Sequence, residues 1–243
     1  MWGNNGAECS RYASIPSLFY LSEYARGNKD EEKIKAKFKR ILGADYDAFM
    51  ALEDIKMAYK GQTVSRGQGD RMALYSDLFN GFLDAKVKDG FERELALAAE
   101  KHRESARKYR KWAYMFDSAA KLCDVLAMKY TLGIRTRCAY RAKDLEELKR
   151  LANEEYTRLY KAVDRFALAF EKQWYTENKT AGFDVQDIRL GGLMRRIDSC
   201  RRRLLDYVSG KISFIEELEC ELIPLDEAPI IHNYTEIASP NLI

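Results

Sequence analysis

The chain has 243 residues, and its 41 lysine and arginine residues nearly balance its 38 aspartate and glutamate residues, leaving a formal net charge of +3 at pH 7. This near-neutral balance excludes the strong positive electrostatic field that steers proteins to nucleic acid or to membrane surfaces. With 47% hydrophobic residues, the chain is long enough to bury a sizeable core. It contains no apolar run of about 18 residues, so we expect no membrane-spanning helix.

Cysteine and histidine usage narrows the chemistry that the chain can carry. The cysteines are odd in number and widely scattered, at Cys9, Cys123, Cys138, Cys200 and Cys220. This pattern predicts reduced thiols in a cytoplasmic protein rather than a disulfide framework. Two histidines and no closely spaced cysteine pair predict no metal site. The sequence also lacks a phosphate-binding loop and a nucleophile elbow, so we expect no cofactor and no catalytic residue, and the N-terminus does not have the pattern of a signal peptide.

The first third of the chain predicts short helices that glycines separate. Apolar residues recur at helical spacing over residues 14–27, over 30–42, from about 45, and over 70–83. Gly81 lies inside the last of these segments and weakens the expectation of an unbroken helix. Residues 61–69 contain three glycines and predict a loop.

From Phe91 onward the pattern predicts long helices. Apolar residues keep a helical period over 91–130, 143–178 and 184–208, with a possible break at Gly133. Ser213 and Glu216 suggest a capping box for a last short helix before Pro224, and residues 224–243 have no helical period. The sequence therefore predicts an all-α fold: several short helices, then a long-helix antiparallel bundle, then an extended C-terminal tail.

The densest basic cluster lies on the last long helix. Its members are Arg195, Arg196, Arg201, Arg202 and Arg203. One interpretation is a phosphate-binding face for nucleic acid or another anion. The alternative is a solvated or acid-paired helix face, neutralised by the acids that follow at Glu216, Glu217, Glu219 and Glu221. The small net charge and the absence of a helix-turn-helix pattern favour the second interpretation, so we expect no nucleic-acid partner.

The junction between the last two long helices is chemically richer. It carries an aromatic ring, an amide, an acid and a cation at Trp174, Asn178, Asp184 and Arg189. Such residues can line a site for a sugar or another small polar ligand, because rings stack and polar groups bind hydroxyls. The alternative is a structural turn in which Asn178 and Asp184 act as caps. Gly191 and Gly192 each cost about 1 kcal/mol inside a helix, so we expect something to approach them closely.

The N-terminal segment Trp2-Gly3-Asn4-Asn5-Gly6-Ala7-Glu8 places a tryptophan and an acid on a tight loop. Together with residues 17–24, 74–84 and 178–193, it resembles bacterial family 20 glycoside hydrolases, the β-N-acetylhexosaminidases, and in particular streptococcal-type exo-β-N-acetylglucosaminidases. The resemblance spans most of the chain and is to the C-terminal end of those enzymes. The N-terminal segment looks like the last loop of their catalytic barrel, whose tryptophan and acid contact the terminal N-acetylhexosamine.

The resemblance implies a larger parent enzyme that acts on an N-acetylhexosamine-containing glycan and forms a homodimer. In that family the acetamido oxygen of the substrate attacks the anomeric carbon, an aspartate orients it, and a neighbouring glutamate is the general acid. No segment of this chain matches the Asp-Glu pair or the barrel that carries it. Of the family's substrate contacts, the resemblance therefore transfers only Trp2 and Glu8 to this sequence.

Two hypotheses follow for the chain. In the first, residues 1–13 are a remnant of a preceding barrel, 14–223 form a helical C-terminal domain, and 224–243 form the tail. This domain is not catalytic alone, supports dimerisation and shapes the sugar site. The candidate substrate-binding residues are Trp2, Glu8, Trp174, Asn178, Asp184 and Arg189. In the second hypothesis, the chain is a free-standing helical protein that binds a partner or an anion through the Arg195–Arg203 face.

Overall fold

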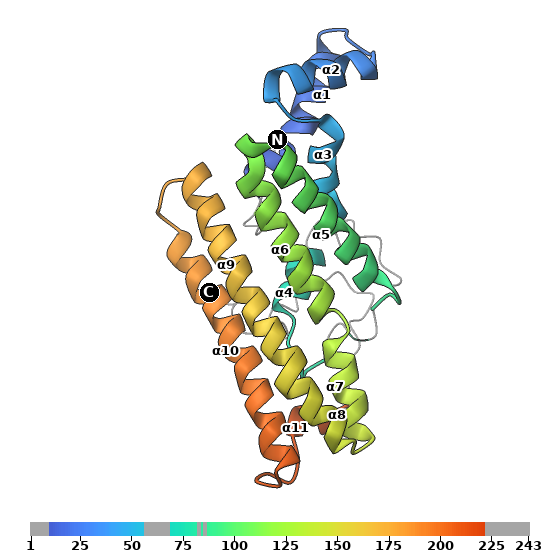
Figure 1. Ribbon diagram of the computed structural model, residues 1–243, viewed down its shortest axis with the longest axis vertical. Coiled ribbons are helices and arrows are strands. Elements are labelled where there is room, and N and C mark those ends of the chain that lie inside the picture. Colours follow the sequence, from blue (N-terminus) through green and yellow to red (C-terminus); the bar gives the residue numbers. More distant parts are fainter. Residues whose placement is uncertain (1–9, 56–68, 82–83, 85–86, 222–243) are drawn as a thin grey trace.

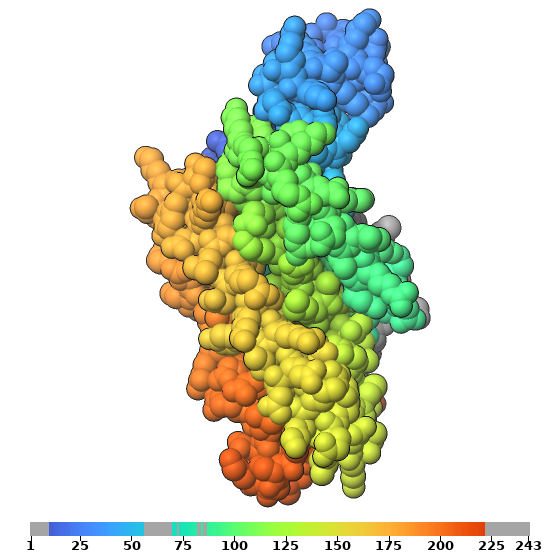
Figure 2. Space-filling view, viewed as in Figure 1, coloured from blue at the N-terminus to red at the C-terminus, as the bar shows by residue number. Residues whose placement is uncertain are grey.

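The computed structural model describes residues 10–55, 69–81, 84 and 87–221, and every regular element in these ranges is a helix. The all-α prediction is confirmed. Long helices run side by side along the molecule, and a group of short N-terminal helices projects from one end (Figures 1 and 2). Within the described ranges, no helix combines the length and the apolar character needed to cross a membrane.

The N-terminal group contains the short helices that the glycine-punctuated pattern predicts. Its elements are η1 (Arg11–Ser14), α1 (Ile15–Ala25), α2 (Glu31–Leu42), α3 (Tyr46–Met50) and η2 (Ala51–Ile55). Pro16 lies in the first turn of α1, where its missing N–H costs nothing. The Asp30 carboxylate caps α2 by accepting from the Lys33 N–H, and Gly43 ends α2 with a φ of 71°. Edge-to-face rings of Phe38, Phe49 and Trp112 join this group to the bundle.

The bundle is built from four long helices. These are α5 (Phe91–Lys108), α6 (Ala113–Lys129), α9 (Thr157–Glu177) and α10 (Phe183–Val208). Helix α5 packs on α6, α6 on α9, and α9 on α10, with the two members of each pair running in opposite directions (Figure 1). Their apolar stripes form one core that includes the fully buried Leu95, Leu126 and Phe166. The antiparallel long-helix bundle is therefore confirmed.

Shorter elements complete the other end of the bundle. They are α7 (Leu132–Arg141), α8 (Leu145–Arg150), a π-helical turn (Leu151–Tyr156) and α11 (Glu216–Glu219), while α4 (Gly69–Tyr75) packs against α6. Helix α8, the π-helical turn and α9 follow one another without a break, as the predicted helix over 143–178 requires. Gly133 lies inside α7, where a Cβ would come 3.0 Å from the Leu78 carbonyl oxygen. This glycine therefore serves close packing, and the expected break between the two helices falls at Tyr130 and Thr131, directly before α7.

Three boundary predictions are wrong for identifiable reasons. The helix expected over 70–83 ends at Tyr75, because the Asp77 carboxylate accepts from the N–H groups of Phe79 and Asn80 and forms a turn. The period over 91–130 belongs to two helices, and the chain folds back at Tyr109. Ile215, not Ser213, is the N-cap residue of α11. The loop predicted over 61–69 and the tail over 224–243 lie outside the described residues, except for Gly69, which begins α4.

Candidate functional site

The turn between α9 and α10 is held by tightly packed rings. Asn178 leaves the helical region of backbone space and ends α9, while Gly182, with a φ of 91°, is the N-cap residue of α10. The Trp174 indole N–H donates to the Lys179 carbonyl over 2.9 Å, and a Cβ at Gly182 would lie 3.6 Å from the Trp174 ring. Trp174 also contacts Phe170 and Phe183. Trp174 therefore clamps the turn between the two helices and is only partly exposed.

The start of the described chain is fastened to this same turn. The Ser10 hydroxyl donates to the Glu177 carboxylate, and the Arg11 guanidinium donates to the Asn178 side-chain oxygen over 3.1 Å and to the Glu177 carbonyl over 3.3 Å. The Tyr12 ring meets Trp112 edge to face. We call the contacts of Ser10 and Arg11 with Glu177 and Asn178 the N-terminal latch. The latch joins two parts of the sequence that are 167 residues apart.

The electrostatics of the latch centre on Glu177. Burial raises the pKa of the Glu177 carboxyl, and the hydroxyl donors Ser10 and Tyr114 oppose that rise without cancelling it. The same burial, together with the Glu177 charge, raises the pKa of Tyr114. A carboxylate held mainly by hydroxyl groups is less stabilised in its charged form than one paired with a guanidinium. The surroundings of Glu177 therefore disfavour its charged form.

The structure describes four of the six predicted site residues and separates them into three sets. Trp174 and Asn178 lie together at the turn, where Asn178 binds Arg11. Asp184 is exposed in the first turn of α10, and Gly182 rather than Asp184 is the N-cap residue. Arg189 points the other way: it is 3% exposed and its guanidinium lies 4.5 Å from the centre of the Tyr75 ring. Trp2 and Glu8 lie outside the described residues, but Ser10, which follows Glu8 by two positions, is part of the latch.

Sequence reasoning missed the acceptor of the latch and found only its neighbour. Asn178 was singled out, whereas Glu177, Arg11 and Tyr114 were not. No local pattern marks these residues, because their contacts join segments distant in sequence. Gln186 was also missed: it is buried on α10, and its side-chain oxygen has no hydrogen-bond partner among the described residues. Such a buried polar group is costly when it is unpaired.

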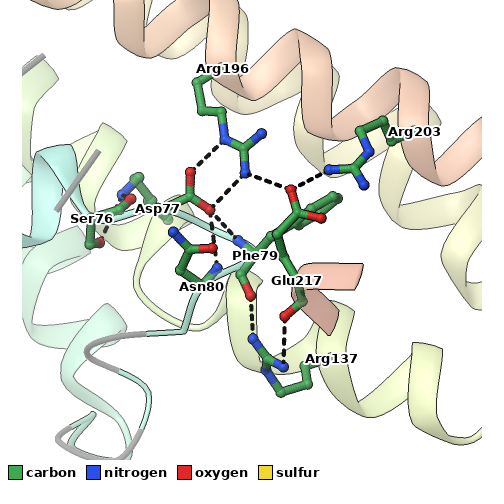
Figure 3. Close-up of polar contacts among 9 residues, drawn as sticks. Ser76, Asp77, Phe79, Asn80, Arg137, Arg196, Arg203 and Glu217 are labelled. Carbon is green, nitrogen blue, oxygen red and sulfur yellow. Dashed lines mark hydrogen bonds and ion pairs between the residues drawn. The ribbon is translucent and has the colours of Figure 1, made fainter. Parts of the chain in front are cut away.

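The arginine cluster on α10 divides between two faces of the helix. Arg196 and Arg203 turn toward Glu217 of α11, and Arg196 also binds Asp77 (Figure 3). Burial works to raise the pKa of Asp77, but the hydrogen bonds and charge of Arg196 outweigh it and lower that pKa. Below them, Arg137 donates to the carbonyl groups of Phe79 and Glu217 (Figure 3). These arginines are therefore part of the packing of the fold, and of the four acids expected to neutralise the cluster, Glu217 is the one whose ion pairs with Arg196 and Arg203 the described residues show.

Two other buried titratable groups of the described chain, His102 and Lys129, are surrounded by packing contacts and do not line a substrate site. His102 is fully buried against Phe116, neither ring nitrogen has a partner among the described residues, and burial lowers its pKa to about 4. The Lys129 ammonium donates to the Ala73 carbonyl over 2.7 Å and to the Ser76 hydroxyl over 3.0 Å, and burial lowers its pKa to about 7. The cavity beside Lys129 has about 20 Å³ of room, which fits one water molecule and no substrate.

Comparison with known proteins identifies the chain at the level of a family. The described residues contain no cluster of three or more His, Cys, Asp or Glu side chains that could hold a metal ion. A comparison with curated proteins finds no match. A family model described as the Glycoside Hydrolase 20C C-terminal domain matches residues 47–233, which is most of the chain. The match confirms the resemblance to the C-terminal part of family 20 glycoside hydrolases, and the chain belongs to the glycoside hydrolase 20C C-terminal domain family.

Proposed function

We propose that this chain is the helical C-terminal domain of a β-N-acetylhexosaminidase and that it positions the segment that contacts the terminal sugar. The observation that carries the proposal is the N-terminal latch. Ser10 and Arg11 come two and three positions after the end of the segment that resembles the last loop of the barrel, and they are hydrogen-bonded to Glu177 and Asn178. A loop binds a sugar in a preorganised way only when neighbouring residues hold it in a fixed position. The latch supplies such contacts shortly after the N-terminal segment.

The proposed substrate is a glycan with a terminal N-acetylhexosamine, contacted by Trp2 and Glu8 from the N-terminal segment. Asn178 and Trp174 act indirectly: Asn178 holds Arg11, and Trp174 holds the turn in which Asn178 lies. Asp184, which is exposed in the first turn of α10, is a further proposed contact, whereas Arg189, buried against Tyr75, can affect the sugar site only through the packing of α10. The chain alone is not expected to hydrolyse glycans, because the carboxylate pair that drives the chemistry belongs to the barrel. We further propose that the domain supports homodimerisation and that the enzyme works in the cytoplasm, where reduced thiols such as the free, buried Cys123 and Cys200 persist.

The alternative of an anion-binding protein has less support. Arg196 and Arg203 are held by Asp77 and Glu217, so two of the five arginines are not available to a ligand. The remaining three share Asp198. An anion would therefore compete with an existing carboxylate on this face.

The test compares the 243-residue chain alone with the same chain preceded by the barrel encoded upstream in its reading frame. The substrate is a chromogenic N-acetylglucosaminide. The proposal predicts hydrolysis by the longer protein and background rates for the chain alone. A stop codon directly upstream of Met1, or an efficient hydrolase activity of the chain by itself, would contradict it.

A further inference from the structure

The outer surface of the α9–α10 pair carries an unfilled groove. Its volume is about 630 Å³, and it lies between two helices that run along one side of the molecule (Figure 1). Pockets that hold small ligands have volumes of about 300 to 1,000 Å³, so the groove has the size of such a site. It is lined by Tyr160 and Lys161 of α9 and by Arg195 and Arg201 of α10, among others. None of the latch residues is among the described residues that line it.

Gly191 leaves room in this groove. It lies in the interior of α10, it is exposed and lines the groove, and a Cβ built there would meet no atom within 4 Å. No close contact inside the described chain therefore requires glycine at this position, in contrast to Gly133. Glycine is nevertheless among the least favourable residues for a helix interior. A longer side chain would enter the groove, so the glycine keeps open a space that a ligand can fill.

Positive charge is in excess along the groove. Three cationic side chains line it together with a single carboxylate, that of Asp198. Lys161 is exposed and has no ion-pair partner among the described residues. The Arg195 side chain is 70% exposed and meets Asp198 over 3.3 Å, and an ion pair of such exposure adds little to stability. Lys161 and Arg195 are therefore available to an anionic group that enters the groove.

Asp198 competes with such an anion only weakly. Its carboxylate accepts from Arg201 and from Arg202, in each case over 3.0 Å, and these two side chains are less exposed than that of Arg195. The acid thus holds Arg201 in position at the groove and neutralises it in part. An entering anion needs to displace only the longer and more exposed contact of Arg195. The competition on this face is therefore confined to one weak ion pair.

The uncharged lining of the groove fits a sugar ring. Tyr160 is 40% exposed, and the face of an aromatic ring can stack on the C–H groups of a sugar. The Thr157 hydroxyl donates to the Ala152 carbonyl over 3.4 Å, so its oxygen can still accept from a sugar hydroxyl. An inorganic anion has no apolar surface and would leave the Tyr160 ring uncovered. The lining as a whole therefore combines groups for a sugar with groups for an anion.

We propose that this groove binds a small sugar that carries a phosphate or sulfate group. Lys161 and Arg195 bind the anionic group through charge-assisted hydrogen bonds, Tyr160 covers one face of the ring, and Gly191 leaves the space that the ring occupies. The groove shares no residue with the latch or with the N-terminal segment, so this ligand is distinct from the proposed substrate. The inference goes beyond the proposed function, and only the choice of N-acetylglucosamine as the sugar to test rests on it.

Isothermal titration calorimetry with the 243-residue chain tests the site. The probes are N-acetylglucosamine 6-phosphate and N-acetylglucosamine 6-sulfate, and the controls are N-acetylglucosamine and inorganic phosphate. We expect one saturable site for an ester, with a dissociation constant at least tenfold below that of either control, because only an ester uses both the cations and the ring. The two esters show which anionic group the site takes. Equal affinity for inorganic phosphate or for the neutral sugar overturns the proposal, and so does the absence of saturable binding of both esters.

Single substitutions locate the binding. Lys161→Gln and Arg195→Gln should each raise the dissociation constant of the ester about tenfold, since each removes a charge-assisted hydrogen bond. Lys172→Gln, the same change at another exposed position of α9, is the matched control and should leave it unchanged. Gly191→Gln should weaken binding at least tenfold while the melting temperature holds or rises, because a better helix former then fills the groove. Binding that survives all three groove variants overturns the proposal.

The calorimetric readout does not depend on hydrolysis. An ester that binds in the groove, combined with no hexosaminidase activity in the longer protein, overturns the proposed function alone. Hydrolysis by the longer protein, combined with no ester binding to the chain, overturns this inference alone.

Discussion

Two carboxylates beside α10, the buried Asp77 and the partly buried Glu177, hold distant segments in place, but they do so in different ways. At the C-terminal half, Asp77 binds the Arg196 guanidinium, and its pKa is lowered. At the N-terminal end, Glu177 is held by hydroxyl groups at the latch, and burial raises its pKa. The first arrangement keeps a fixed charge inside the fold. The second leaves a carboxylate whose charge is only weakly supported, which suits a contact between the domain and the segment that precedes it.

Removing the charge of Asp77 should lower the free energy of unfolding more than any other single substitution proposed for this chain. In Asp77→Asn, the partly buried Arg196 loses its main carboxylate partner, and we expect a loss of about 3 kcal/mol in the free energy of unfolding. Urea denaturation followed by circular dichroism measures it. Asp198→Asn, which removes a more exposed acceptor on the same helix, is the control and should cost about 1 kcal/mol or less. Equal losses in the two variants would contradict the claim that the Asp77–Arg196 pair stabilises the fold more than the exposed contacts of Asp198 do.

The free energy of unfolding also depends on pH through His102, and this contribution must be measured separately from that of Glu177. Its pKa is lowered to about 4 in the folded chain, so its contribution to stability is present above the unfolded pKa near 6.5 and is lost as the pH falls toward 4. The loss amounts to about 2 to 3 kcal/mol over that window. His102→Phe should remove this dependence, since no described residue bonds either ring nitrogen. An unchanged pH profile in this variant would contradict the burial of a neutral histidine.

Breaking the latch should cost less than breaking the Asp77 pair. Glu177→Ala removes the acceptor of the Ser10 hydroxyl and leaves the partly buried Tyr114 without this neighbour, so we expect a loss of about 1 to 2 kcal/mol in the free energy of unfolding at pH 7. Urea denaturation again measures the effect. The loss should be accompanied by faster proteolysis of the chain before Tyr12. A loss as large as that of Asp77→Asn would contradict the claim that the Glu177 carboxylate contributes less to stability than the Asp77 carboxylate does.

Glu177→Gln should change the stability of the fold least, and the direction of the change with pH should be clear. Because the folded pKa of Glu177 is raised, the wild type loses stability as the pH rises from about 4.5 through that pKa, whereas the amide does not titrate. The Gln variant should therefore match the wild type near pH 4 and equal or exceed it at pH 7. Thermal unfolding at the two pH values measures the difference. A Gln variant that is less stable at pH 7 than at pH 4, relative to wild type, would show that the charged carboxylate is favoured.

The periodic patterns predicted the helices, because apolar spacing is a local property of the sequence. The long-helix bundle and the turn at residues 178–182 both follow from neighbouring residues. The errors have tertiary causes. The reversal at Tyr109 is accompanied by contacts of the Trp112 indole and the Tyr109 hydroxyl with residues 42 and 45, and no helical period contains that information.

The candidate site was predictable only in part for the same reason. Asn178 and Trp174 stood out because they lie at a helix junction, and both do lie at the turn. Arg189 has the right chemistry for a ligand but faces Tyr75, since its direction depends on the rotation of α10 about its axis. Glu177 could not be recognised, because its role depends on Ser10 and Arg11 at the other end of the sequence.

The most direct test of the account measures kcat/KM for a chromogenic N-acetylglucosaminide in the barrel-containing protein, with and without the latch. The double variant Glu177→Ala/Asn178→Ala releases Ser10 and Arg11 without touching the barrel. Since a misplacement of about 1 Å can cost a hundredfold in rate, we predict a fall in kcat/KM of about tenfold or more with the fold retained. A value of kcat/KM equal to that of the wild type would contradict the central claim that this helical domain positions the sugar-contacting segment.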